Sequence, residues 1–134
     1  MNTKLLSAAV ILLVAAGTGG IASGASPAGG APGSTLRFSA QVDNPWFPLT
    51  PGTTALYAGA KDGKRARDVV RATRSTKTIE GAPCRVVEDR LYLDGWLAER
   101  TTDWYTQDRA GNVWYFGEST ATLDRQGRVT STEG

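Results

Sequence analysis

The sequence predicts an all-β domain, an antiparallel meander that forms a curved sheet, a half-barrel or a small barrel. Three observations support this prediction. Turn-forming pairs of an acidic residue and glycine recur at 62–63, 80–81 and 94–95. The runs between these turns are short and rich in Val, Thr and aromatic residues, which strands favour. The same runs lack the 3.6-residue apolar period of an amphipathic helix.

The first residues of the chain are typical of an export signal. Lys4 precedes an uncharged, mostly apolar run at 5–16, and the small residues 22–25 follow it. This run is shorter than the roughly 20 residues that span a membrane. We therefore expect a signal peptide at 1–25, a secreted or extracytoplasmic protein, and no stable membrane insertion after cleavage. The alternative is an uncleaved anchor.

A linker and a single domain follow the signal. Residues 26–35 are Gly, Ala, Ser, Pro and Thr, a composition that gives a flexible linker. Residues 36–134 are expected to form a single β domain. Removal of Lys4 lowers the formal net charge from +2 to about +1, and acidic and basic residues are interleaved. We therefore expect no nucleic-acid partner, and interpret the basic residues of 61–74 as a solvated strand face.

The domain begins with a proline-rich segment at 38–52. Its three prolines exclude a helix and favour an extended chain. We expect a strap over an opening of the sheet that lays Trp46, Phe47 and Leu49 along a surface. The alternative is an ordinary packed lead-in to the first strand.

The expected strands follow from the runs between the turns. They are 54–58, 68–79, 84–93, 96–107, 112–118, 120–124 and 128–130. Cys84 is the only cysteine, so it forms no internal disulfide, and we expect it to be buried in its strand. The chain stops just after its last strand begins, which would leave that strand without a partner. We therefore expect the domain to be C-terminally truncated.

The sequence around 103–118 predicts the central hairpin. Five of the eleven aromatic residues lie between 104 and 116, in two runs that flank a polar segment. Asp108 and Gly111 stand at the first and fourth positions of a type I turn, which is often followed by a one-residue bulge. In this register Tyr105 faces Tyr115, and Trp104 faces Phe116.

The register also assigns side chains to faces. One face would carry Trp104, Trp114 and Phe116, and the other Asp103, Tyr105, Val113 and Tyr115. Because tyrosine hydroxyls need water or a partner, we expect the tryptophan face to pack in the core.

The residue types limit the chemistry. The absence of histidine excludes Ser-His-Asp and Cys-His systems and the common imidazole metal sites. Carboxylates remain, and a hydrolase would use Glu99 and Asp103 as catalytic residues. A ligand-binding surface would instead use Asp103, Tyr105, Tyr115 and Trp46. The alternative is a solvent-exposed strand face that neither binds a ligand nor takes part in catalysis.

Two other sites stay open. A half-barrel could carry an apolar ligand in a cavity lined by Trp46, Trp104 and Trp114. Calcium could bind Asp108 with Asn112, or Asp103 with Glu118, although the spacing matches no dense calcium loop. We expect no metal and no cofactor. The expected partner is an unknown small molecule or an envelope polymer.

Two motifs carry a resemblance to known proteins. They are Asn44-Pro45-Trp46-Phe47-Pro48-Leu49-x-Pro51-Gly52-Thr53 and Asp103-Trp104-Tyr105-x-Gln107-Asp108-x-x-Gly111-Asn112-Val113-Trp114-Tyr115-Phe116-Gly117-Glu118. Over 38–118 the chain resembles a group of uncharacterised secreted bacterial proteins. Those proteins continue beyond the point where this chain stops. The resemblance implies export, and it brings no established activity and no catalytic residues.

We therefore expect a secreted, non-catalytic β domain that binds a ligand or associates with the cell envelope. The alternatives are the carboxylate-dependent hydrolase and the apolar carrier. Replacing Glu99 and Asp103 by their amides would abolish turnover in a hydrolase and only weaken a binding protein.

Overall fold

A computed structural model describes residues 37–134 and shows an all-β fold. The expected signal peptide (1–25) and linker (26–35) lie outside the described residues. The strands are β1 (Phe38–Ser39), β2 (Thr54–Lys61), β3 (Lys64–Ile79), β4 (Ala82–Leu93), β5 (Trp96–Asp108), β6 (Val113–Leu123) and β7 (Val129–Glu133). Within 37–134, the structure contains no helix that could cross a membrane.

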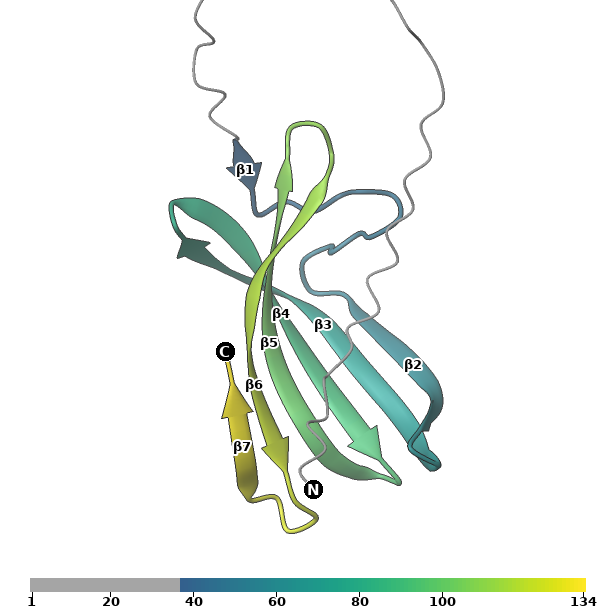
Figure 1. Cartoon of the computed structure of the whole chain (residues 1–134). Helices are drawn as coiled ribbons and strands as arrows, with labels where there is room; N and C mark the ends of the chain where they lie inside the picture. The colour runs from purple at the N-terminus through teal and green to yellow at the C-terminus, as the bar shows by residue number, and fades with distance from the viewer. Residues whose placement is uncertain (1–36) are drawn as a thin grey trace, which may run out of the picture. The chain divides into compact units, whose positions relative to one another are not determined.

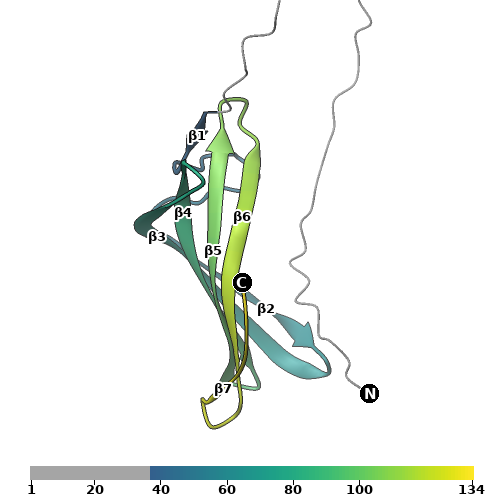
Figure 2. The same ribbon diagram turned by 60° about the vertical axis from the view of Figure 1, so that its left-hand side comes forward.

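The strands form one antiparallel meander. They lie in the order β2-β3-β4-β5-β6-β7, and β1 pairs with β5 beside the hairpin end of the sheet (Figure 1). The sheet curves strongly, and β2 turns away from the direction of β5 and β6 (Figure 2). It is not closed, because β2 and β7 pair with their neighbours and not with each other. The prediction of an all-β meander is confirmed, with an open curved sheet as its form.

The turns between the strands use the residues that the sequence singled out. Asp62, Glu80 and Asp94 have φ values of 52°, 48° and 48°. The glycine after each of them also has a positive φ. Two successive residues with positive φ form the tight turn whose twist matches that of the strands. The expected turns are therefore present, and the strands that they join are longer than expected.

Irregularities interrupt the regular pairing of β3 with β4 and of β6 with β5. In β3 the register shifts between Ala72 and Thr76, which places Arg74 in an unpaired segment. In β6 the residues at 116–117 lie opposite one residue of β5, and Gly117 has a φ of 115°. The expectation of separate strands at 112–118 and 120–124 was wrong, because Ser119, which lies between them, pairs directly with Thr102 and keeps the two parts in one ladder.

The register gives the sheet two chemically different faces, since directly paired residues share a face. The strap face carries Ala72, Val87, Asp89, Glu99, Asp103, Tyr105, Tyr115 and Glu118. The arginine face carries Arg67, Arg71, Arg90, Arg100, Trp104 and Trp114. Most of the acidic residues thus lie on one side with Tyr105 and Tyr115, and most of the arginines lie on the other with Trp104 and Trp114; Arg85 and Glu88 are exceptions.

The core lies under the strap, which is the segment 40–52 between β1 and β2. Val42 and Leu49 of the strap are buried against Ala72 and Val87, and Tyr105 packs beside them. The strap is closed by a hydrogen bond from the Leu49 N–H to the Val42 carbonyl at 2.9 Å. The expectation of a strap that covers the sheet agrees with this arrangement for Phe47 and Leu49, whereas Trp46, which was expected to lie along the surface, is 92% exposed.

The expectation that the tryptophan face forms the core was wrong. The buried cluster lies on the Tyr105 side, while the side chain of Trp114 remains 42% exposed. The physical reason is the strap, whose two apolar side chains cover the tyrosine side of the sheet. On the other side Trp114 is covered only in part, by an edge contact with Phe38 at 5.9 Å between ring centres.

Candidate functional site

The hairpin turn at the end of β5 has the geometry that its sequence predicts. The Gly111 N–H donates to the Asp108 carbonyl at 3.1 Å, and the Asp108 N–H donates to the Asn112 carbonyl at 3.0 Å. Gly111 has a φ of 86°, as a type I turn with a one-residue bulge requires. The register prediction is confirmed for Tyr105 and Tyr115, which are direct partners.

The carboxylate of Asp108 stabilises this turn. It accepts hydrogen bonds from the Ala110 N–H, the Asn112 N–H, the Asn112 side-chain amide and the Trp114 indole N–H, each at 2.9 Å. The side-chain donors, Asn112 first, lower the pKa of Asp108 to about 2. Its oxygens are thus engaged by N–H donors, which leaves a calcium ion at Asp108 and Asn112 without support.

The strap is fastened to the hairpin by Gln107. Its side-chain oxygen accepts the Asp43 N–H at 3.0 Å and the Asn44 N–H at 2.9 Å, and its amide nitrogen donates to the Asp43 carboxylate at 2.7 Å. The Asn44 side-chain amide donates to the Gly111 carbonyl at 2.8 Å. The two sequence motifs of the chain therefore contact each other, and their polar residues hold the strap in place.

The side chains of Trp46 and Phe47, which are neighbours in the strap, differ in exposure. The Asn44 side chain accepts the Trp46 N–H at 2.9 Å, and the Phe47 N–H donates to the Asn44 carbonyl at 3.1 Å. This turn leaves Trp46 92% exposed, whereas Phe47 packs on Tyr105 with ring centres 5.2 Å apart. Trp46, Trp104 and Trp114 are not brought together, since Trp104 and Trp114 lie on the arginine face.

Three aromatic rings form a row on the strap face. Phe47 contacts Tyr105, and Tyr105 contacts Tyr115 at 5.1 Å between ring centres. Phe47 and Tyr115 remain 43% and 40% exposed. We call Phe47, Tyr105 and Tyr115, with the carboxyls of Asp103 and Glu118, the aromatic-acidic surface.

The hydroxyl of Tyr115 lies between two carboxyl groups. It is 3.0 Å from Asp103 Oδ1 and 2.8 Å from Glu118 Oε2. A phenol carries one proton, so it donates to one of these oxygens at a time. The second contact is satisfied when that carboxyl itself carries a proton. Two carboxyl groups are thus held close together with one donor between them.

Burial and repulsion change the ionisation of this cluster. Burial first, and then the charges of Glu118, Asp68 and Glu99, raise the pKa of Asp103 to about 6. The Tyr115 hydroxyl acts in the opposite direction by donating to the carboxylate. Burial also raises the pKa of both tyrosines. The tyrosines therefore act as neutral donors and rings.

A second carboxyl pair lies beside the first. Burial first, and then a hydrogen bond with Asp68 and the charge of Asp68, raise the pKa of Asp89 to about 8. One oxygen of Asp68 is buried without a donor. A protonated Asp89 supplies that donor, and this hydrogen bond favours the protonated form of Asp89.

Glu99 lies on the same face as Asp103, as the sequence predicts. The extra residue of β5 is Ala98, before Glu99, so the bulge leaves the grouping of Glu99, Asp103 and Tyr105 intact. The sequence did not point to Asp68 or Asp89, it suggested Glu118 only as a calcium ligand with Asp103, and it suggested Phe47 only as part of the strap. Strand alternation places the three acids on one face once the register is known, but pairing across β3, β4 and β6 cannot be derived from one strand.

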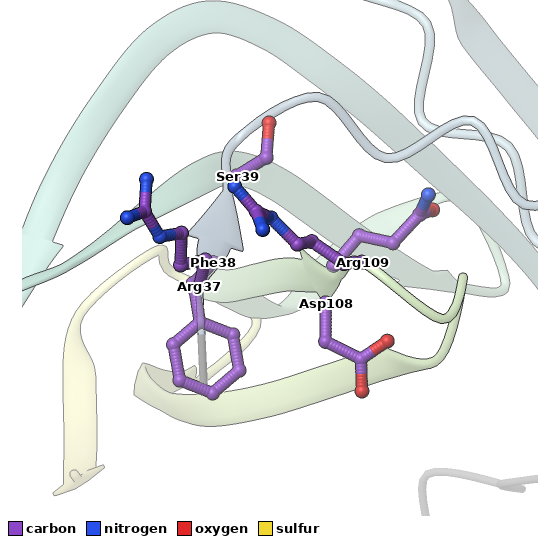
Figure 3. A pocket seen from close by; sticks show the side chains of 6 residues that line it. Arg37, Phe38, Ser39, Asp108 and Arg109 are labelled. Carbon is purple, nitrogen blue, oxygen red and sulfur yellow. The ribbon is translucent and has the colours of Figure 1, made fainter. Parts of the chain in front are cut away.

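Arginines line two clefts among residues 37–134. One cleft of about 270 Å³ lies beside β1 and the hairpin, between Arg37, Phe38, Ser39 and Arg109 (Figure 3). The carboxyl of Asp108 points away from the Arg109 side chain there. The other cleft, of about 370 Å³, contains Arg90 and Arg100. Across 37–134, His, Cys, Asp and Glu side chains form no group of three that could hold a metal ion.

Comparisons with known proteins give no assignment: no family model, curated protein or solved structure matches the chain.

Proposed function

We propose that the protein is an exported, non-catalytic binding domain whose aromatic-acidic surface takes a cationic organic ligand. The observation that carries this proposal is the Tyr115 hydroxyl, which stands between Asp103 and Glu118 next to the Tyr105 ring. A cation placed on these rings would interact with their negative faces and with the two carboxyl groups together.

Charge supports this ligand class. Asp103, Asp89 and Glu118 lie on one face of the sheet, and their mutual repulsion contributes to the raised pKa values of Asp103 and Asp89. Arg85 also lies on this face, but it is buried and donates to the backbone carbonyls of Ala40, Thr73 and Ser75. A bound ammonium group would relieve the repulsion, so its binding should release protons near neutral pH.

The expected ligand is the ammonium group of a small molecule or of an envelope polymer. Cation–π contacts contribute about 0.5–2 kcal/mol each. Two or three such contacts together with a charge pair give an affinity on the order of 1 mM for a small probe. A polymer with repeated ammonium groups would bind more tightly through multiple contacts.

Choline chloride is a suitable probe, titrated into the full chain and followed by amide chemical shifts. Tyr115→Phe keeps the ring and removes the hydroxyl, and Asp103→Asn removes one charge; each should weaken choline binding about three- to tenfold. Tyr57→Phe is the matched control, because Tyr57 is an exposed tyrosine of the edge strand β2. Equal affinities in all three variants would contradict the proposed surface.

A carboxylate-dependent hydrolase is the second candidate. The observation that favours it is Asp103, whose pKa of about 6 is that of a general acid, with Glu99 on the same face. A panel of chromogenic glycosides tests this activity. Turnover that is abolished in Asp103→Asn and in Glu99→Gln would favour the hydrolase over the binding domain.

Export and kinship with the secreted bacterial proteins are part of the same proposal. The contact of Asn44 with Gln107 and Gly111 gives a structural reason for the two motifs that carry the resemblance, because each motif supplies half of the joint. Mass determination of the mature chain after expression in a bacterium with an intact export system tests cleavage near residue 25.

A further inference from the structure

A cleft on the arginine face has the donors of an anion-binding site. It is about 370 Å³ in volume and lies across β4, β5, β6 and β7. Arg90 and Arg100 supply two guanidinium groups. Its polar lining is completed by hydroxyl groups, chiefly those of Thr102, Ser119 and Thr132. Guanidinium and hydroxyl groups are the side chains that proteins use to bind oxyanions.

The two arginines stand directly opposite each other. Arg90 and Arg100 are register partners in the β4–β5 ladder, and like charges in that position repel. Arg90 uses one nitrogen, Nη1, to donate to the backbone carbonyls of Asp89 and Thr101. Its other nitrogens and the exposed guanidinium of Arg100 make no ion pair with the described residues.

Glu88, an acidic residue on the same face, does not neutralise this pair. Glu88 lies on the same face, opposite Thr102, and its carboxylate is 4.0 Å from the Arg71 guanidinium. Arg71 thus shares the charge of Glu88, while Arg90 and Arg100 keep theirs. Ala121 is 9% exposed, and its small side chain leaves room above β6.

We propose that this cleft binds a phosphate group, with Arg90 and Arg100 on either side and the hydroxyls of Thr102, Ser119 and Thr132 as further donors. Arginine forks bind two oxygens of a tetrahedral oxyanion at once, and an anion between two arginines removes the repulsion between them. The ligand that supplies this phosphate group is either free inorganic phosphate or a phosphate diester of a larger molecule. The cleft lies on the face opposite the aromatic-acidic surface, so it is independent of that proposal.

The test is a titration of the full chain with inorganic phosphate, and separately with dimethyl phosphate, at constant ionic strength. Constant ionic strength keeps general screening the same in each sample. We expect saturable amide shifts centred on Arg100, Thr102 and Ser119. Binding of phosphate alone identifies free phosphate as the ligand, and binding of both identifies the diester as a ligand too.

Two variants separate a site from a diffuse positive face. Arg100→Gln should weaken phosphate binding at least about tenfold, since it removes an exposed charge-assisted donor. Arg67→Gln is the matched control, because Arg67 lies on the same face but stacks on Tyr92 outside the cleft; it should change the affinity less than about twofold. The proposal is overturned by shifts that do not saturate, or by equal weakening in both variants.

Discussion

Gln107 and Asn44 are 63 residues apart in the chain and are joined by a 2.9 Å hydrogen bond from the Asn44 N–H to the Gln107 side-chain oxygen. The same oxygen accepts the N–H of Asp43. This joint fixes the strap on the hairpin, and the strap in turn places Phe47 on Tyr105. The aromatic-acidic surface therefore depends on a polar contact made outside it.

Replacing Gln107 by Ala should destabilise the fold by about 1–3 kcal/mol, because two backbone N–H groups of the strap lose their acceptor. Urea denaturation followed by tryptophan fluorescence measures the loss. Gln126→Ala, in the exposed turn before β7, is the control and should stay within about 0.5 kcal/mol of the wild type. A Gln107 variant as stable as this control would show that the joint is unimportant.

Leu49→Ala should cost about 2–4 kcal/mol, because Leu49 is 7% exposed and its removal leaves a cavity in the core under the strap. Trp46→Ala removes a larger side chain from the same strap, yet it should cost less than about 0.5 kcal/mol since Trp46 is 92% exposed. Chemical denaturation compares the two. The reverse order of effects would mean that the core lies elsewhere.

The stability of the protein should increase as the pH falls from 9 to 5. The pKa of Asp89 is raised from 3.8 to about 8, so the folded protein binds this proton more tightly than the unfolded chain does between those values. The stabilisation is complete below about pH 4 and is lost as the pH rises through 8. Asp103, with a pKa of about 6, contributes in the same direction.

Asp89→Asn should flatten this pH dependence and stabilise the protein at pH 9. We expect about 1–2 kcal/mol, a small value because the group is partly exposed and solvent screens its charge. Thermal unfolding between pH 5 and 9 is the measurement. A pH dependence that is unchanged in Asp89→Asn would contradict the raised pKa of Asp89.

The acid side of the profile should depend on the hairpin turn. The pKa of Asp108 is lowered to about 2, so its stabilisation is present above the ordinary pKa of 3.8 and is lost as the pH falls towards 2. In Asp108→Asn the loss of stability between pH 4 and 2 should be smaller than in the wild type. Glu80→Gln, in the exposed turn between β3 and β4, should leave that loss unchanged. Equal losses in the wild type and Asp108→Asn would contradict this role.

Local sequence was sufficient to predict the turns. Asp108 and Gly111 predict the type I turn, and the turn sets the pairing of Tyr105 with Tyr115. Local sequence was insufficient to predict which face of the sheet forms the core, because two apolar side chains of the strap, Val42 and Leu49, cover one face. A comparison of Trp and Tyr side chains within the hairpin contains no information about a segment 60 residues earlier.

The candidate site was predicted in part for the same reason. Asp103, Tyr105 and Tyr115 follow from one hairpin, so the sequence brings them together. The contribution of Asp89 depends on the pairing of three strands. Trp46 was expected at the site, yet the turn at Asn44 leaves it exposed while Phe47 takes the place on Tyr105. The residue that packs on Tyr105 is thus one position later in the strap than expected. The backbone of the turn at Asn44 determines which of the two side chains reaches the sheet.

The most direct test of the binding surface compares choline with its neutral isostere, 3,3-dimethyl-1-butanol, in amide shift titrations of the wild-type chain at pH 7. The two probes have nearly the same shape, so they differ in the charge that the aromatic-acidic surface should recognise. The predicted result is saturable shifts at Tyr105, Tyr115 and Glu118 with choline and much weaker shifts with the alcohol. Equal responses to both probes, or no response to choline, would contradict the account.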